Sequence, residues 1–335
     1  MLMIRIGRIF ISPARLILIV GTLLFFAVVF KLTSQHIGPG SSSLLDTSLR
    51  FDGESALSPD MGLPLDPTGA WNETRVIFNR VSKVGSRSLL NVIMRLSQKL
   101  EFKRERSPVF VKVFLNETGE KIFIKEIEAL EPPYIYDRHL DYVDFETYGS
   151  AVKPVWINLT RDPVSRLVSF YYYTRFGDSF SVPEWTGAPE DFNQTFDECV
   201  LNNKYECSTE NTFRVVPYFC GQKDECRTPS RWAIEQAKKN VVEKFLFVGI
   251  TEQFNSTLVI LERLLPKFFE GALEAYKVTL SSIRDQFKSK SKIEPSEEAL
   301  KIQRERMALE VEFYEFVKKR MLLIKEQLGI PENPM

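Results

Sequence analysis

From residue 75 onward, short apolar runs alternate along the chain with longer amphipathic stretches. The short runs predict strands, and the amphipathic stretches predict helices that cover them. Because the two alternate, the pattern indicates an α/β domain with a central parallel sheet flanked by helices. The expected strands are 75–80, one near 109–114, 155–160 and 245–250, and the expected helices are 86–98, 163–174, one near 229–243, 252–265 and a long terminal helix at 296–327.

An apolar run near the N-terminus predicts a membrane anchor. Residues 16–30 are apolar almost throughout, and Arg5, Arg8 and Arg15 precede them. Positive charges before a span keep the N-terminus in the cytoplasm, and the absence of a small-residue cleavage site after the run disfavours the alternative of a cleaved signal peptide. We therefore expect a single-pass type II protein of the Golgi membrane. Its parts would be a cytoplasmic tail at 1–15, a transmembrane signal anchor at 16–32, a stem at 33–70 rich in Ser, Gly and Pro, and a lumenal catalytic domain at 71–335.

The overall charge excludes a general attraction to polyanions. The 335 residues contain 44 Lys and Arg against 44 Asp and Glu, so no net field draws nucleic acid to the protein. Nucleic acid is therefore not an expected partner, and an anionic ligand must be held by a local group of cations. With 44% hydrophobic residues, the chain can still bury a full core.

Glycosylation sequons fit a lumenal domain. Asn72, Asn116, Asn193 and Asn255 each begin an acceptor sequon for N-glycosylation. Asn158 begins another, but it lies in an apolar strand, so we expect it to be buried and unmodified.

The four cysteines, Cys199, Cys207, Cys220 and Cys226, cluster in one stretch. An even number of cysteines in an oxidising compartment predicts two local disulfides, most simply Cys199 with Cys207 and Cys220 with Cys226. A zinc site is the alternative, but CxxC pairs are missing, so no metal is expected.

A turn rich in Ser, Gly and cations joins the first strand to the first helix. The sequence SKVGSRS puts Lys83, Gly85 and Arg87 at a helix N-terminus, where free N–H groups and the helix dipole favour an anion. The spacing does not match a Walker A motif, which disfavours an ATPase or a kinase. The turn predicts an anion cradle, with an ordinary surface turn as the alternative.

A second strand-to-helix junction reads INLTRDPVSRLVS. Arg161 follows the end of an apolar strand, and Ser169 lies two turns into the next helix, which begins at Pro163 after a capping Asp162. Because parallel strands present their carboxyl ends at one edge, both junctions can face one ligand. A nucleoside with a phosphate at each end fits two separate anion-binding junctions better than a triphosphate does. Alternatively, Arg161 and Asp162 form an ordinary surface pair.

Both junctions resemble motifs of the sulfotransferases. SKVGSRS is similar to their 5′-phosphosulfate loop and INLTRDPVSRLVS to their 3′-phosphate element. The blocks RHLDYVDF, RLVSFYYYTRFGD, FDECVLNNKYECS, VPYFCGQKDECR and RWAIEQAKKNVVEKFLFVGITEQF resemble the uronyl 2-O-sulfotransferases, over nearly all of residues 75–327. That group includes the heparan sulfate and the dermatan/chondroitin 2-O enzymes.

The resemblance implies a P-loop-like sulfotransferase domain and 3′-phosphoadenosine 5′-phosphosulfate as the donor. It also matches the positions of all four cysteines. The residues implied around the 5′-phosphosulfate are Lys83, Val84, Gly85, Ser86, Arg87 and Ser88, and those implied at the 3′-phosphate are Arg161 and Ser169.

Transfer to a sugar hydroxyl needs a base. The chain has two histidines, His36 in the expected stem and His139. An imidazole accepts a proton near neutral pH, and the resemblance implies that His139 is the catalytic histidine. Without the resemblance, a structural or surface role for His139 would be the better interpretation. We expect His139 to deprotonate a uronic acid 2-hydroxyl while Lys83 stabilises the leaving phosphate.

The expected acceptor, a glycosaminoglycan or related uronate-containing glycan, is a polyanion. Arg80, Arg138 and Arg175 adjoin the motifs and are candidates to bind its carboxylates or sulfates, with solubilising surface charge as the alternative for each. The basic stretch 282–292 is either a loop that closes over nucleotide or glycan, or a linker before the last helix.

The flanks of His139 bear on the acceptor. Heparan-type members carry a second histidine where this chain has Asp137, and the Arg138–His139 pair is more similar to the dermatan/chondroitin branch. The stretch 177–192 is acidic where relatives carry arginines, which makes a less sulfated acceptor conceivable. Resemblance to the heparan type also implies a homo-oligomer, a trimer. The competing interpretations are a heparan sulfate-specific 2-O-sulfotransferase, a glycan-binding lumenal pseudoenzyme and a nucleotide kinase.

Overall fold

A computed structural model describes residues 4–6, 9–11, 72–109, 112–332 and 334. The chain divides into two units, residues 1–56 and 57–335. In the first unit, β1 (Ile4–Ile6) and β2 (Ile9–Ile11) pair in antiparallel fashion. The expected anchor at 16–32 and stem at 33–70 lie outside the described residues. Among the residues that are described, no helix has the length and apolar character that a membrane span requires.

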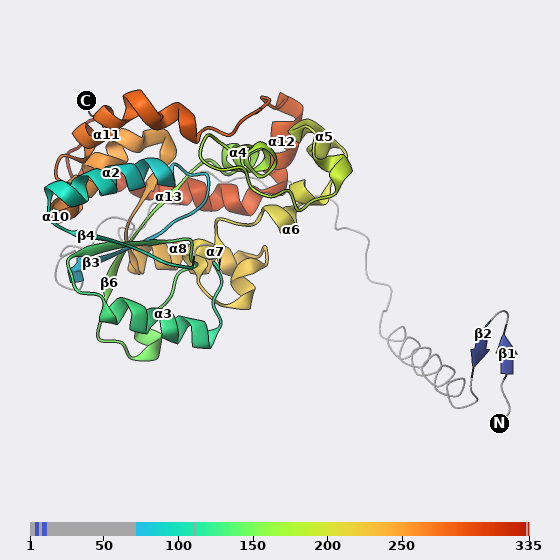
Figure 1. Ribbon diagram of the computed structural model, residues 1–335, viewed down its shortest axis with the longest axis horizontal. Coiled ribbons are helices and arrows are strands. Elements are labelled where there is room, and N and C mark those ends of the chain that lie inside the picture. Colours follow the sequence, from blue (N-terminus) through green and yellow to red (C-terminus); the bar gives the residue numbers. More distant parts are fainter. Residues whose placement is uncertain (1–3, 7–8, 12–71, 110–111, 333, 335) are drawn as a thin grey trace, which may run out of the picture. The chain divides into compact units, whose positions relative to one another are not determined.

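Five parallel strands form the centre of the second unit (Figure 1). The first strand of this sheet along the chain is the middle one, the next two lie on one side of it, and the last two lie on the other side. The direction in which strands are added therefore reverses beside the middle strand. Such a reversal leaves a crevice at the carboxyl ends of the strands. From edge to edge the strands are β4 (Lys103–Arg106), β5 (Tyr134–Arg138), β3 (Asn72–Asn79), β6 (Pro154–Thr160) and β7 (Phe245–Ile250), and each neighbouring pair is parallel.

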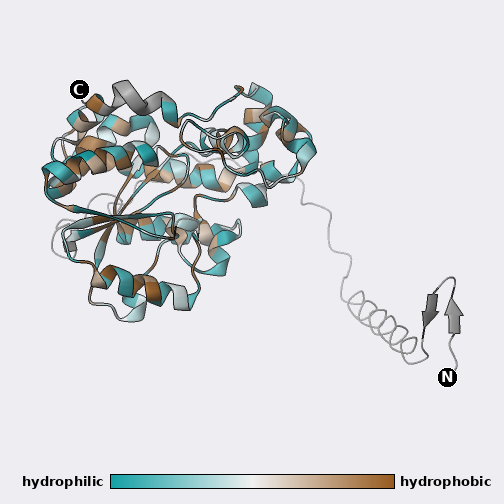
Figure 2. Ribbon diagram, viewed as in Figure 1, coloured by the Kyte–Doolittle hydropathy of each residue, from teal (hydrophilic) through white to brown (hydrophobic). Residues whose placement is uncertain are grey.

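Helices cover both faces of the sheet, as the alternating pattern predicts. Every residue of β5, β6 and β7 is buried, as expected for parallel strands that are covered on both faces. Figure 2 shows hydrophobic residues along the central strands. In Figure 1, α2 (Ser86–Lys99), α10 (Pro266–Phe269) and α11 (Ala272–Ile283) lie on one side of the sheet, and α3 (Glu117–Ala129) and α7 (Pro217–Cys220) lie on the other. The remaining helices include α6 (Thr209–Thr212), α8 (Arg231–Glu243), α9 (Phe254–Leu264) and α13 (Ala308–Gln327).

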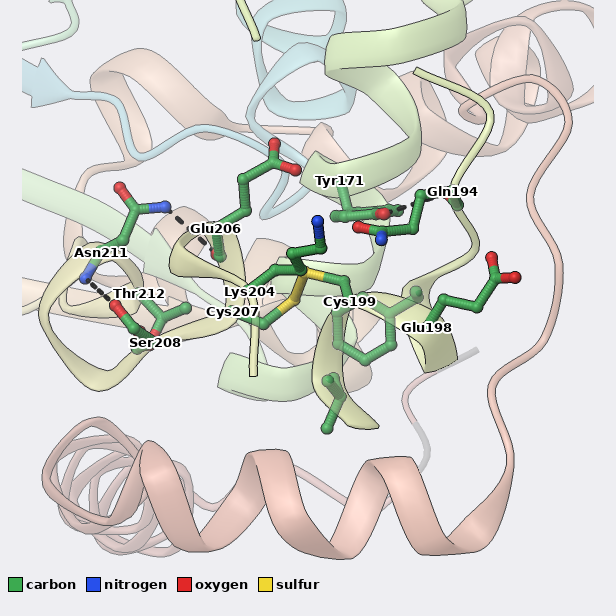
Figure 3. Close-up of a disulfide and its surroundings, with 12 residues drawn as sticks. Tyr171, Gln194, Glu198, Cys199, Lys204, Glu206, Cys207, Ser208, Asn211 and Thr212 are labelled. Atoms are coloured by element: carbon green, nitrogen blue, oxygen red, sulfur yellow. Dashed lines mark hydrogen bonds between the residues drawn. A yellow bond between two sulfur atoms is a disulfide. The ribbon is translucent and has the colours of Figure 1, made fainter. Parts of the chain in front are cut away.

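A smaller core lies beside the main one. It joins α4 (Pro163–Phe176), α5 (Phe196–Leu201) and α12 (Glu297–Arg306), and it includes Cys199 and Cys207. The disulfide between these two cysteines holds α5 to the turn that follows it (Figure 3). The second disulfide joins Cys220 to Cys226. Both pairings predicted from the sequence are confirmed.

Two predicted elements need correction, and two observed elements were not predicted. The described part of 109–114 forms no strand. The strand in this region is β4, an edge strand that pairs only with β5. Its residues KRER have no apolar side, and an edge position tolerates such a sequence. Helix α3 and strand β5 were not expected from the sequence. The long terminal helix is two helices, α12 and α13, separated at the buried Met307. The other predicted elements match within a few residues.

Candidate active site

The carboxyl ends of four strands surround a cavity of about 1340 Å³. Arg80 and the turn after it follow β3, His139 follows β5, Arg161 follows β6 and Thr251 follows β7. Residues of both predicted junctions therefore line one cavity. The predicted residues that line the cavity are Arg80, Lys83, Gly85, Ser86, Arg87, Ser88, His139, Arg161 and Ser169.

The turn after β3 presents a helix N-terminus to this cavity. Gly85 occupies the N-cap position of α2 with φ of 79°, and no side chain caps the helix. A β-carbon at Gly85 would lie 3.4 Å from Thr251 Cγ2. Thr251 Oγ1 is within hydrogen-bond distance of the carbonyl oxygens of Val84 (2.6 Å) and Thr160 (3.0 Å), which ties the turn to the end of β6. The side chain of Val84 is fully buried, so Val84 can contribute only its backbone to the site. An uncapped helix N-terminus of this kind can bind an anion, as predicted for an anion cradle.

Lys83 is the central cation of the cradle. Its Nζ lies 4.2 Å from the centre of the Tyr173 ring, and Arg161 donates a hydrogen bond of 3.4 Å to its carbonyl oxygen. Burial lowers the pKa of Lys83 to about 8, and Arg87 and Arg161 add to this effect while the charge of Asp178 opposes it. An anionic ligand beside Lys83 would restore the charged form of the amine.

Arg87 has a carboxylate partner that the sequence analysis missed. Its guanidinium pairs with the buried Asp178 and reaches the hydroxyls of Tyr173 (3.5 Å) and Ser181 (3.4 Å). The acidic character of 177–192 was noted in the sequence, but nothing there indicated that this stretch contacts the first turn of α2.

The described part of the basic stretch 282–292 borders the cavity through Phe287, Lys288, Ser289 and Lys292. Ser289 donates a hydrogen bond of 2.7 Å to the carbonyl oxygen of Ser169, beside the predicted 3′-phosphate position. Of the two interpretations of this stretch, the structure therefore supports a loop at the site.

His139 is held by a backbone carbonyl. Its Nδ1 lies 2.7 Å from the carbonyl oxygen of Arg80. Because a carbonyl oxygen only accepts, Nδ1 carries the hydrogen, and in the neutral ring Nε2 is the acceptor. Burial lowers the pKa of His139 to about 4, and the positive charge of Arg80 is the second largest cause of this decrease. The imidazole is therefore neutral at physiological pH and able to take a proton.

Asp137 holds Arg80 rather than acting beside His139. Its carboxylate pairs with Arg80 at 3.0 Å and with Arg104 of β4 at 3.2 Å, and it is 1% exposed. Arg80 is thereby fixed in the wall of the cavity.

Two of the three predicted acceptor-binding arginines are not brought to the cavity. Arg138 donates a hydrogen bond of 3.0 Å to the carbonyl oxygen of Lys112. Arg175 is buried between the rings of Tyr171 and Trp185 and pairs with Glu206 at 2.5 Å. Helix geometry explains its position: the face of α4 that lines the cavity carries Arg166, Ser169, Phe170, Tyr173 and Thr174, and Arg175 lies off this stripe.

The predicted sequons differ in exposure. Asn116, Asn193 and Asn255 are exposed, whereas Asn158 is 2% exposed and donates a hydrogen bond of 2.8 Å to Asn79. Burial of Asn158 is confirmed; occupancy of the other sequons stays a prediction. Asn72 lies in β3. Within the described residues, no group of three or more His, Cys, Asp or Glu is placed to hold a metal ion.

The family of the chain follows from comparison with known proteins. The model of the sulfotransferase family matches residues 72–317, and the protein belongs to this family. The chain is 36% identical to "Uronyl 2-sulfotransferase" of Homo sapiens over 324 residues, which cover 93% of this chain and 77% of the relative. It is 34% identical to "Heparan sulfate 2-O-sulfotransferase 1" of Gallus gallus over 75% of this chain and 71% of the relative. The predicted resemblance to uronyl 2-O-sulfotransferases is confirmed.

A solved structure is also similar. Mouse sulfotransferase SULT7A1 complexed with PAP aligns with a TM-score of 0.36 and 12% identity over 76% of this chain and 89% of that one, a likeness too low to add to the assignment.

Proposed function

We propose that this protein is a glycosaminoglycan uronyl 2-O-sulfotransferase. It transfers sulfate from 3′-phosphoadenosine 5′-phosphosulfate to the 2-hydroxyl of a uronic acid residue. The observation that carries the proposal is that an anion cradle and a neutral, oriented histidine line one cavity. The names of the relatives, uronyl 2-sulfotransferase and heparan sulfate 2-O-sulfotransferase, support the same reaction.

The residues of the cradle fit the donor. The uncapped N-terminus of α2 and the cation of Lys83 suit a 5′-phosphosulfate, together with Gly85, Ser86, Arg87 and Ser88. Arg161 and Ser169, which line the same cavity, suit a 3′-phosphate, and Lys288 adds a positive charge to the cavity wall.

His139 and Lys83 divide the chemistry. When bound, the donor supplies the sulfuryl group, which forms a bond to the 2-hydroxyl oxygen as the bond to the 5′-phosphate oxygen breaks. His139 Nε2 accepts the hydroxyl proton, so the oxygen attacks without carrying a full positive charge. Lys83 and the N–H groups of the turn stabilise the negative charge that develops on the phosphate. Arg80, which Asp137 fixes in the cavity wall, is the one of the three predicted acceptor-binding arginines that borders this cavity.

The cellular setting belongs to the same proposal. We infer a type II Golgi membrane protein with a lumenal catalytic domain. The two disulfides and the exposed sequons at Asn116, Asn193 and Asn255 support an oxidising, glycosylating compartment. Resemblance to the heparan type further leads us to expect a homo-oligomer.

The test is sulfate transfer from labelled donor to desulfated heparan, dermatan and chondroitin, followed by disaccharide analysis of the product. We expect label at a uronic acid 2-position. His139→Ala should abolish turnover and leave adenosine 3′,5′-bisphosphate binding near normal, because His139 is assigned to the acceptor side. His36→Ala, which changes the other histidine of the chain, is the matched control and should stay active.

Each alternative has its own outcome. Nucleotide binding without transfer to any of the three acceptors would indicate a glycan-binding pseudoenzyme and refute the proposal. Tight binding of magnesium-ATP would indicate a kinase. Turnover retained in His139→Ala would refute the assigned base.

A further inference from the structure

Asp141 is a buried carboxyl group in the cavity wall that has no role in the mechanism above. It lies two residues after His139, and both residues line the cavity. Its backbone is fixed on both sides, because its N–H donates to the carbonyl oxygen of Val113 at 3.1 Å and its own carbonyl oxygen accepts from Gln222 Nε2 at 2.7 Å. The side chain is therefore held at this point of the wall.

The carboxyl group has no hydrogen-bond partner at Oδ1 among the described residues, although the residue is only 2% exposed. The other buried carboxylates at the site differ from it: Asp137 is paired with two arginines, and Asp178 is paired with Arg87. Buried polar groups are nearly always hydrogen-bonded, because an unmet bond costs free energy. Asp141 is therefore a carboxyl group of the cavity wall whose hydrogen-bonding capacity the described residues do not fill.

The surroundings favour the uncharged form of Asp141. Burial raises its pKa to about 8, and the guanidinium of Arg227, which lies over the Phe114 ring, opposes this only in part. The Tyr218 phenol on α7 also interacts with the charge of Asp141, and burial raises the pKa of that phenol well above its usual range. Near neutral pH, Asp141 thus offers an O–H donor and a carbonyl acceptor.

We propose that Asp141 is an acceptor-binding residue, whose carboxyl group forms a hydrogen bond with an oxygen of the sugar presented to His139. The inference rests on the proposed function and identifies a binding residue for it. Its consequence is a pH dependence. When Asp141 ionises, the site loses the donor and gains a negative charge that faces a polyanion, so acceptor binding weakens.

The experiment measures KM for the acceptor between pH 6 and pH 9 at saturating donor, with the desulfated polysaccharide that the wild type turns over best. For a group with a pKa of about 8, KM of the wild type should rise about tenfold over this range. Asp141→Asn keeps an N–H donor and cannot ionise, so its KM should stay flat. Titration of Lys83 is common to both proteins, and it therefore cancels in the comparison.

A matched control and a second variant complete the design. Glu210→Gln removes an exposed carboxylate from the wall of the same cavity, so it should change KM by one factor at every pH and keep the tenfold rise. Asp141→Ser keeps a donor in a smaller side chain and should also give a flat profile, which preserves the test if the Asn variant folds poorly.

The outcomes separate the two proposals. If the wild type transfers sulfate and its rise in KM persists in both Asp141 variants, the role of Asp141 is overturned while the proposed function stands. If the wild type sulfates none of the acceptors at any pH, the proposed function itself fails.

Discussion

Replacing Asp137 by alanine should lower the free energy of unfolding by about 3–5 kcal/mol, the usual cost of removing one partner of a buried ion pair. The carboxylate is 1% exposed and contacts Arg80 at 3.0 Å and Arg104 at 3.2 Å. Arg80 is itself only 4% exposed, so without Asp137 its charge loses a compensating partner in a poorly solvated position.

The two arginines predict different effects. Arg104 is 24% exposed, and Arg104→Ala leaves the Arg80–Asp137 pair in place, so it should cost about 1 kcal/mol or less. Urea unfolding of the two variants and the wild type measures both numbers. In thermal unfolding, the difference corresponds to about 2–4 °C for each kcal/mol in a domain of this size.

An activity readout distinguishes this pair from an ordinary stabilising contact. The carbonyl oxygen of Arg80 accepts from His139 Nδ1, so a disturbed Arg80 should also reduce kcat. If Asp137→Ala unfolds within 1 kcal/mol of the wild type, or if Arg104→Ala is equally destabilising, the interpretation of Asp137 as the fixed point of this network is wrong.

Three further predictions concern the site. Burial lowers the pKa of His139 to about 4, so the imidazole can accept a proton only above that pH, and kcat/KM should rise between pH 3 and pH 5 and then level off. Burial also lowers the pKa of Lys83 to about 8, so Lys83 loses its charge above that pH and KM for the donor should increase. Lys83→Arg should shift this increase in KM to higher pH. An acid limb centred between pH 6 and 7 would contradict the assigned environment of His139. Gly85→Ala, at φ of 79°, should cost about 1–2 kcal/mol and weaken adenosine 3′,5′-bisphosphate binding by up to about tenfold, because the strain falls on the cradle. Gly149→Ala, at φ of 69° with open space around it, is the control: calorimetry should show a similar loss of stability with unchanged nucleotide affinity, and equal affinity losses in both variants would count against the cradle.

Local patterns were enough to identify most of the fold. The fully buried run of β7 is apolar throughout, and that of β6 is apolar except for Asn158 and Thr160. The turn before α2 carries its Gly and cations within seven residues, so periodicity and turn chemistry predicted these elements. The apolar pattern did not predict strands β4 and β5, because their sequences KRER and YIYDR contain charged residues. Their pairing in the sheet, rather than their composition, makes them strands.

The sequence by itself determined the chemistry on offer: a strand-to-helix anion cradle at Lys83 and Gly85, a second grip at Arg161 and Ser169, and His139 as the only imidazole of the expected lumenal domain. Only the tertiary structure decided which charges are available to a ligand. It brought Arg80 to the cavity and buried Arg175 against Glu206, it paired Arg87 with Asp178 across 91 positions, and it left Asp141 in the wall without a partner at Oδ1. The physical reason is that a charge is defined by its neighbours and its solvation, and both depend on contacts between segments that are distant along the chain.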